Sequence, residues 1–183
     1  FGCPKILINC SYPYTNDWKL SNFESVKLNN MRKNVDIHLN SYAWISKLIA
    51  DKMKKNKKKG SIINMSSIYG VVGQDLTIYK NTPIKENFTY SIVKGGIVSF
   101  TRQMASYYGK DGIRINCISS GGVAGHSAGI SKKQNRWKLV VINPCLVLGE
   151  SISKYPTSGS FDLFKPILIH KLSIELLVIY LDI

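Results

Sequence analysis

Two side chains that could move a proton lie four residues apart in the segment TYSIVKGGI, namely Tyr90 and Lys94. At that spacing two residues of a helix share one face, so the phenol and the ammonium would be neighbours. No other tyrosine of the chain has a lysine at this offset. The pair indicates a proton-transfer site, with a half-buried tyrosine and a surface lysine as the alternative interpretation.

A hydroxyl at the end of a predicted strand completes this candidate site. The segment GSIINMSS begins at Gly60, carries the apolar residues Ile62, Ile63 and Met65, and ends with Ser67. A short apolar run that starts at a glycine is typical of a buried strand. The strand would bring the Ser67 hydroxyl to the start of the helix that carries the phenol.

The elements that must position these residues alternate along the chain. The apolar runs 5–9, 61–66 and 113–119 are predicted strands, and the segments 35–55 and 88–108 are predicted helices. Strand, helix, strand, helix, strand is typical of a parallel sheet with helical crossovers. We expect the first helix to bury a stripe of Ile45, Leu48, Ile49 and Met53, and the second a stripe of Val93, Ile97, Thr101, Met104 and Tyr108.

The charge of the chain does not favour nucleic-acid recognition, although the formal net charge is +14. Of the 25 basic residues 21 are lysines, whereas readers of base sequence depend on arginine for bidentate contacts. The lysine run DKMKKNKKKG at 51–60 matches a solvated helix end, because cations suit the C-terminus of a helix. A basic module that binds nucleic acid or anionic surfaces is kept as the weaker alternative.

The four cysteines, Cys3, Cys10, Cys117 and Cys145, form no C-x-x-C motif and have no suitably spaced histidines. The sequence therefore predicts neither a metal site nor a disulfide framework, and reduced thiols favour a cytoplasmic protein. The N-terminal residues lack the layout of a signal peptide. The apolar segment 167–183 is too short and too charged to cross a membrane.

Five segments, taken in order, resemble the short-chain dehydrogenase/reductase family from residue 1 to about residue 125. ILINCSY resembles the strand end at which the family has Asn-Asn-Ala-Gly, with Asn9 at the first Asn. HLNSYAW resembles the helical segment of the family's catalytic Asn, which falls on Asn40. GSIINMSS places the catalytic Ser on Ser67, and YSIVK supplies Tyr90 and Lys94. The fifth segment, RINCISSGGV, resembles the strand and turn beside the nicotinamide.

This resemblance implies an NAD(P)-dependent oxidoreductase that transfers a hydride between the nicotinamide and a hydroxyl or carbonyl compound. Tyr90 would be the acid/base, and Lys94 would lower the pKa of Tyr90 and hold the nicotinamide ribose. Ser67 would bond the substrate oxygen, and Asn40 would position a water that links Lys94 to solvent. The residues implied at the cofactor are Asn9, Tyr90, Lys94, Gly121, Gly122 and Val123.

The sequence departs from the family in its first part. The family's Gly-rich strand-to-helix turn, which cradles the pyrophosphate, is absent from this sequence, as is the residue that selects NAD or NADP. We therefore expect an α/β fold with a partial Rossmann-like, doubly wound parallel sheet that lacks its first three strands. The strand at 5–9 would then have a bare apolar edge.

The end of the chain also departs from the family. Residues 1–130 are predicted to be the catalytic half of a Rossmann domain, and 131–183 a divergent tail of unassigned fold with one strand at 139–142. Ser120 and Gly125 stand where the family usually has Pro and Thr. The extra loop QDLTIYKNTPIKENF would lie over the substrate pocket, and it resembles the branch linked to flagellin modification and surface-sugar synthesis.

Three functional hypotheses follow. The first is an oxidoreductase that uses NAD or NADP on a small molecule such as a sugar derivative, present as an incomplete chain and inactive alone. The second is an inactive truncated or frameshifted remnant, and the third is the basic binding module. The resemblance also implies a homo-oligomer formed through the helices at 35–55 and 88–108.

Overall fold

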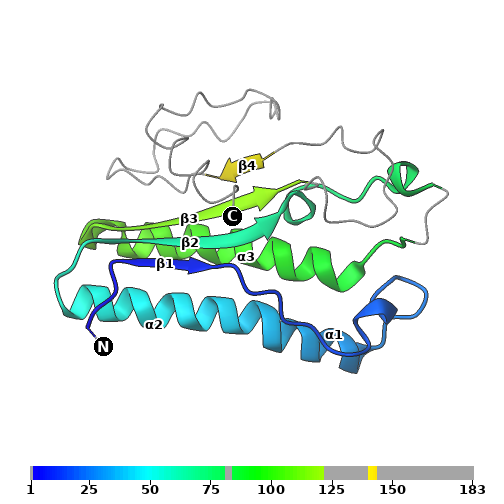
Figure 1. Cartoon of the computed structure of the whole chain (residues 1–183), viewed down its shortest axis with the longest axis horizontal. Helices are drawn as coiled ribbons and strands as arrows, with labels where there is room; N and C mark the ends of the chain where they lie inside the picture. Colours follow the sequence, from blue (N-terminus) through cyan, green and yellow to red (C-terminus); the bar gives the residue numbers. More distant parts are fainter. Residues whose placement is uncertain (1, 81–83, 122–139, 144–183) are drawn as a thin grey trace. The chain divides into compact units, whose positions relative to one another are not determined.

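Four strands form one sheet in the computed structural model, which describes residues 2–80, 84–121 and 140–143 (Figure 1). They are β1 (Ile6–Asn9), β2 (Gly60–Ser67), β3 (Ile113–Ser120) and β4 (Val140–Asn143), and they lie in the order β1-β2-β3-β4. The first three are parallel, which confirms the prediction of a parallel α/β sheet. β4 is antiparallel to β3 and begins one residue after the predicted strand.

The parallel register brings the carboxyl ends of β1, β2 and β3 to one edge of the sheet. Asn9 pairs with Asn64, Asn64 with Cys117, and Ser67 with Ser120. In open α/β sheets ligands bind at the carboxyl ends of the strands. The loops that follow Asn9 and Ser67 are therefore the expected place for a site.

The helical segments connect these strands and cover one face of the sheet. α1 (Leu28–Asn34) continues through a single π-helical turn, Val35–Asn40, into α2 (Ser41–Lys55), and α3 (Phe88–Tyr108) follows β2. α2 and α3 lie side by side against the same face of the sheet (Figure 1). The first helical segment thus starts at Leu28, earlier than the predicted residue 35, whereas α3 has the predicted bounds.

The core lies between this face and the two helices. The predicted stripe of α3 is confirmed, because Val93, Ile97, Thr101 and Tyr108 are buried and Met104 packs on the core. The predicted stripe of α2 is wrong in part: Met53 is buried, but Ile45 and Leu48 are 39% and 45% exposed. The residues that α2 buries instead are Tyr42, Ser46, Ala50 and Met53.

A polar link explains why the small residues of α2, and not its large ones, face the sheet. Asn64 is fully buried in the central strand β2, and its Oδ1 accepts a hydrogen bond from Ser46 at 2.9 Å. Its Nδ2 donates to Thr101 of α3 at 3.1 Å. A buried amide must be hydrogen-bonded, so it selects a hydroxyl residue on each helix. Apolar periodicity alone cannot detect this constraint.

The opposite face of the sheet is open over β1. Ile6 is 61% exposed and Ile8 is 42% exposed, whereas Ile62, on the covered face of β2, is 0% exposed. β1 is also an edge strand, because it pairs with β2 alone within the described residues. The bare apolar edge predicted from the sequence is therefore present in this part of the chain.

Candidate active site

Lys94 is buried among aromatic rings at the carboxyl end of the sheet. Its side chain comes from the second turn of α3, and the residue is 4% exposed. The Nζ atom donates a hydrogen bond to the Met65 carbonyl at 3.2 Å and lies 5.6 Å from the ring centroid of Tyr90. Burial lowers the pKa of Lys94 to about 8, because a low-dielectric environment disfavours the charged form.

Tyr90 lies beside Lys94 in the first turn of α3, as the spacing predicts. Asn87 caps this helix through its Oδ1, which accepts a hydrogen bond from the Tyr90 backbone N–H at 2.7 Å. The Tyr90 side chain lies close enough to that of Ser67 for Ser67 to favour the phenolate form of Tyr90. Burial raises the pKa of Tyr90, and Ser67 counteracts part of that rise.

The direction of this change differs from the lowering that we expected from Lys94. Two features of the geometry explain the difference. The ammonium lies over the ring of Tyr90, and Lys94 is itself desolvated by burial. The lowering of the Tyr90 pKa by Lys94 therefore stays a prediction for the site with its ligands bound.

Ser67 is held against α3 by the tight packing of the segment that follows β2. The Ser66 hydroxyl donates to the Lys94 carbonyl at 2.8 Å, and Ser67 accepts a hydrogen bond from the backbone N–H of Tyr69 at 3.2 Å. A Cβ atom on Gly70 would lie 2.6 Å from the Lys94 carbonyl carbon. Glycine at position 70 therefore permits the approach that brings Ser67, Tyr90 and Lys94 together.

Asn9 ends β1 beneath this site. The residue is 8% exposed, and its Nδ2 donates to the Tyr42 carbonyl of α2 at 3.4 Å. The Tyr42 hydroxyl in turn donates to the Ser11 carbonyl at 2.6 Å. Asn9 therefore joins the end of β1 to α2.

Asn40 does not reach the site. Its side chain is exposed, and its Nδ2 donates to Asp36 at 3.1 Å, one turn back along the helix. The residue that faces Lys94 from the π-helical turn is His38, which is 0% exposed. The geometry thus places Asn40 elsewhere than the resemblance implied, because His38, not Asn40, lies one helical turn before the buried Tyr42.

The sequence analysis missed His38, although one signal could have found it. His38, Tyr42, Ser46 and Ala50 recur every four residues, and all four are buried. The periodicity of large apolar residues does not detect a buried helical stripe that is made of polar and small residues. π-helical turns occur frequently at functional sites, so this histidine belongs among the candidate residues.

Aromatic side chains from the loop after β1 form a wall beside Tyr90. The rings of Tyr12 and Trp18 lie 6.2 Å and 6.4 Å from that of Tyr90, and Tyr14 lies 6.4 Å from Trp18. Tyr12 and Tyr14 are 44% and 58% exposed, so both residues are partly open to solvent. We call Tyr12, Tyr14 and Trp18 the aromatic wall.

Polar contacts fix the loop that carries the aromatic wall. The Asn34 side chain accepts from the Thr15 N–H at 2.9 Å and donates to the Thr15 hydroxyl at 2.7 Å. The Asn30 side chain donates to the Asp17 carbonyl at 3.0 Å and accepts from Ser21 at 3.0 Å. α1 therefore provides a rigid base for the wall through two buried asparagines.

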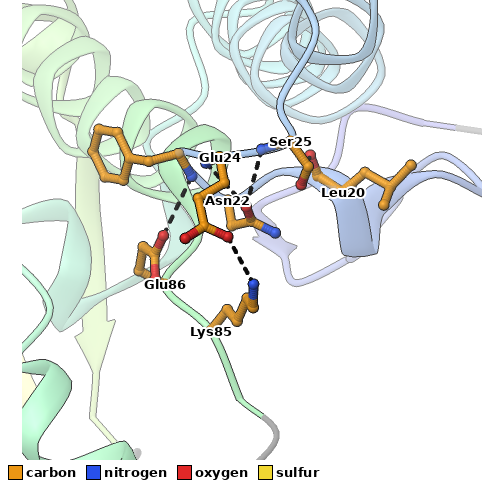
Figure 2. A network of polar contacts seen from close by, with 7 residues as sticks. Leu20, Asn22, Glu24, Ser25, Lys85 and Glu86 are labelled. Carbon is orange, nitrogen blue, oxygen red and sulfur yellow. Dashed lines mark hydrogen bonds and ion pairs between the residues drawn. The ribbon is translucent and has the colours of Figure 1, made fainter.

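Figure 2 shows a second anchor, between segment 20–25 and the loop before α3. Lys85 pairs with Glu24 at 2.9 Å, and Glu86 accepts from the Phe23 N–H at 3.3 Å. The Phe88 N–H also donates to the Ser21 carbonyl at 2.8 Å. The loops that follow β1 and β2 are thus joined at the N-terminus of α3.

A groove of about 400 Å³ lies between these loops. Its lining includes Leu76, Tyr79, Ile84 and the Glu24–Lys85 pair. The Tyr79 hydroxyl lies 2.6 Å from that of Tyr69, and Tyr79 contributes to the raised pKa of Tyr90. The extra loop therefore borders the candidate site through Tyr79, and its role over a substrate remains a prediction.

Two of the residues expected at the cofactor, Gly122 and Val123, lie outside the described residues. Gly121 is described and is half-buried directly after β3. Within residues 2–80, 84–121 and 140–143 no cluster of His, Cys, Asp and Glu could hold a metal ion. In the same ranges no helix is long and apolar enough to cross a membrane.

Comparison with known proteins agrees with this arrangement. Residues 6–143 match the family described as Enoyl-(Acyl carrier protein) reductase. Post-translational flagellin modification protein A of Campylobacter coli is 30% identical over 129 residues, which cover 70% of this chain and 50% of that protein. Glucose 1-dehydrogenase 2 of Bacillus subtilis is 29% identical over 60% of this chain and 38% of that protein.

A solved structure shows the same fold. A short chain dehydrogenase from Leptospira borgpetersenii with bound NAD+ superposes with a TM-score of 0.59 at 32% identity, covering 72% of this chain and 48% of that one. The chain therefore belongs to the short-chain dehydrogenase/reductase family of NAD(P)-binding oxidoreductases. It spans about half the length, or less, of the curated relatives it matches.

Proposed function

We propose that this protein is an NAD(P)-dependent oxidoreductase that moves a hydride between the cofactor and a hydroxyl or carbonyl carbon of a sugar derivative. Tyr90 exchanges the proton on the substrate oxygen, and Ser67 donates a hydrogen bond to that oxygen as its charge develops. Lys94 stabilises the phenolate form of Tyr90 through its positive charge. Each role uses an atom that the fold brings to the carboxyl end of the sheet.

One observation carries this proposal: Ser67, Tyr90 and Lys94 converge, although they come from a strand end and from two turns of a helix. The closeness of Tyr90 and Ser67 supports a role in which both hydroxyls contact a single substrate oxygen. The Lys94 ammonium lies beside the same tyrosine ring. This arrangement suits proton transfer to or from an oxygen atom.

The described residues fit the nicotinamide end of the cofactor. The Lys94 ammonium has three N–H groups, and its hydrogen bond to the Met65 carbonyl uses one of them. The remaining donors suit the hydroxyls of a ribose, and Asn9, Tyr90, Gly121, Gly122 and Val123 are proposed to complete the contact with the cofactor. The bound cofactor would supply or accept the hydride.

The aromatic wall supports a sugar derivative as the substrate. Tyr12, which lies next to Tyr90, and its neighbour Tyr14 are both partly open to solvent. A sugar ring has an apolar C–H face and a rim of hydroxyls, which suits rings that carry polar tips. The names of two relatives, a glucose 1-dehydrogenase and a flagellin modification protein, favour the same class.

A homo-oligomer formed through the helices at 35–55 and 88–108 is part of this proposal. Ile37, Trp44, Ile45 and Leu48 are exposed on the helical segment that leads through α2, at 36%, 60%, 39% and 45%. Exposed apolar residues at helical spacing are typical of an interface. A cytoplasmic location likewise stays a prediction.

The test of the proposed reaction is turnover after the change Tyr90→Phe, made in a full-length protein completed with the family's Gly-rich cofactor-binding part. We expect the loss of the hydroxyl to lower kcat by about 10²- to 10⁴-fold, the usual contribution of an acid/base group. Tyr107→Phe is the matched control, because Tyr107 lies on the same helix and is 53% exposed. Turnover would be measured by nicotinamide absorbance with sugars and simple alcohols as substrates. Activity that survives Tyr90→Phe would overturn the role of Tyr90.

A cofactor titration tests whether the 183-residue chain acts as an enzyme by itself. Fluorescence of NADH and of NADPH would be followed as the 183-residue chain is added. We expect no quenching at micromolar cofactor, because the sequence contains no Gly-rich pyrophosphate turn. Tight binding would show that the chain is an autonomous enzyme. Binding without any turnover would favour the inactive remnant.

A further inference from the structure

Two tyrosine hydroxyls meet where the extra loop folds back toward the end of β2. Tyr69 lies in the 3₁₀ turn Ile68–Gly70, and its backbone N–H donates to the Ser67 Oγ at 3.2 Å. Tyr79 ends a second 3₁₀ turn, Leu76–Tyr79, and its hydroxyl lies 2.6 Å from that of Tyr69. The pair therefore joins the extra loop to the turn that begins at the candidate catalytic serine.

The hydroxyl pair borders both the groove and the candidate site. Tyr79 lines the groove of about 400 Å³, together with the apolar residues Leu76 and Ile84. Burial is the main cause of the raised pKa of Tyr69 and of Tyr90, and the two phenols are also coupled to each other through the pair: Tyr90 contributes to the first rise and Tyr79 to the second. A molecule that occupies the groove and reaches Tyr90 would thus meet the two hydroxyls.

The chemistry of the pair suits an uncharged hydroxyl as its ligand. Burial and the bond to Tyr79 raise the pKa of Tyr69, so this phenol stays protonated at neutral pH. One hydroxyl donates to the other, and the Tyr69 oxygen therefore keeps either its own O–H or a lone pair for a further bond. A substrate hydroxyl fits both cases because it donates and accepts, whereas a carboxylate only accepts and an ammonium only donates.

We propose that Tyr69, oriented by Tyr79, determines specificity by binding a second hydroxyl of the substrate, on the carbon next to the one that reacts at Tyr90. The inference rests on the function proposed above and narrows its substrate class to vicinal diols and α-hydroxy carbonyl compounds. The bond from the Tyr69 N–H to Ser67 holds both residues in one tight turn, which suits side chains that contact neighbouring oxygens of one molecule. The aromatic wall would cover the apolar C–H face of the same ring.

The experiment compares two probes that differ by one hydroxyl, cyclohexane-1,2-diol and cyclohexanol. Their dissociation constants are measured by NMR titration of the 183-residue chain with labelled tyrosine, without cofactor. We expect the diol to bind about fivefold more tightly, the usual net effect of one hydrogen bond. Tyr69→Phe keeps the ring but removes the hydroxyl, so it should abolish this preference. Tyr79→Phe should weaken the preference, because Tyr69 loses the partner that orients its hydroxyl.

The matched control is Tyr107→Phe, because Tyr107 lies on α3 and is 53% exposed. This variant should keep the preference of the wild type for the diol. A bond between Tyr69 and Tyr79 that only fastens the extra loop predicts a different result. In that case the two variants of the pair would lose stability and still prefer the diol as the wild type does.

Three results would each overturn the proposal: equal affinities of the wild type for the two probes, no binding of either probe, or an unchanged preference in Tyr69→Phe. If Tyr69→Phe fails to fold, an NOE between the Tyr69 ring and the bound diol in the wild type decides, and its absence excludes the contact. Because binding is measured without cofactor or turnover, failure here leaves the Tyr90→Phe test of the reaction intact, and failure of that test leaves the diol preference intact.

Discussion

The two faces of the sheet differ in what covers them. On one face α2 and α3 bury Ile62, the Asn64 link and the residues that converge near Tyr90. On the other face Ile6 and Ile8 of β1 remain exposed. Within the described residues, the well-packed core therefore lies between the sheet and the two helices, and α3 on that covered face supplies Tyr90 and Lys94.

The largest expected effect tests this contrast directly. Ile62→Ala should lower the free energy of unfolding by about 3 kcal/mol, because it leaves a cavity in packed surroundings. Ile6→Ala should cost less than about 1 kcal/mol, since that side chain is 61% exposed and loses mainly strand propensity. Urea unfolding followed by circular dichroism measures both. Equal costs would mean that a further segment covers β1, and the contrast between the faces would be lost.

The second prediction concerns the close packing of the turn after β2 against the backbone of α3. Gly70→Ala should destabilise the protein by about 2 kcal/mol, because its Cβ would lie 2.6 Å from the Lys94 carbonyl carbon and oxygen, which are backbone atoms. Gly73→Ala is the control, since nothing lies within 4 Å of a Cβ at that position. Both variants are compared by urea unfolding. A neutral Gly70→Ala would show that the turn after β2 does not hold Ser67 against α3.

The third prediction concerns how the free energy of unfolding depends on pH through the buried His38. The pKa of His38 falls from 6.5 to about 4 on folding, so the unfolded chain binds more protons between these values. Stability is therefore fully present above pH 6.5 and decreases as the pH falls toward 4. Between pH 7 and pH 5 we expect a loss of about 2 kcal/mol.

The control for this pH effect is His38→Asn, because asparagine does not ionise between pH 5 and pH 7. The free energy of unfolding of this variant should be nearly constant over that interval. The groups that face His38 are Tyr12, Tyr42 and Lys94. The Lys94 pKa of about 8 places its own effect above pH 8, outside this interval. A wild-type protein that is equally stable at pH 5 and pH 7 would contradict the buried neutral state of His38.

The elements of the covered face could be predicted from sequence because each depends on local signals. Glycine at the start of β2, the apolar runs of the strands and the apolar period of α3 were sufficient to predict the parallel sheet and the bounds of α3. The π-helical turn had no such signal, and it decides whether His38 or Asn40 faces Lys94. The exposed Ile45 and Leu48 of α2 show the same limit, since the buried Asn64 determines which face of the helix packs.

The smallest expected effect on stability lies on the open face. Ile8→Thr keeps a β-branched side chain in the strand, so the free energy of unfolding should change by less than about 0.5 kcal/mol. The apolar edge of β1 is a template for association, and a hydroxyl there should weaken it. Light scattering over a series of protein concentrations should show less self-association for Ile8→Thr than for the wild type. Trp44→Ser serves as the comparison, because it changes an exposed residue of α2 instead. If only Trp44→Ser reduces association, the helices and not the open face form the contact, and the exposed isoleucines do not drive assembly.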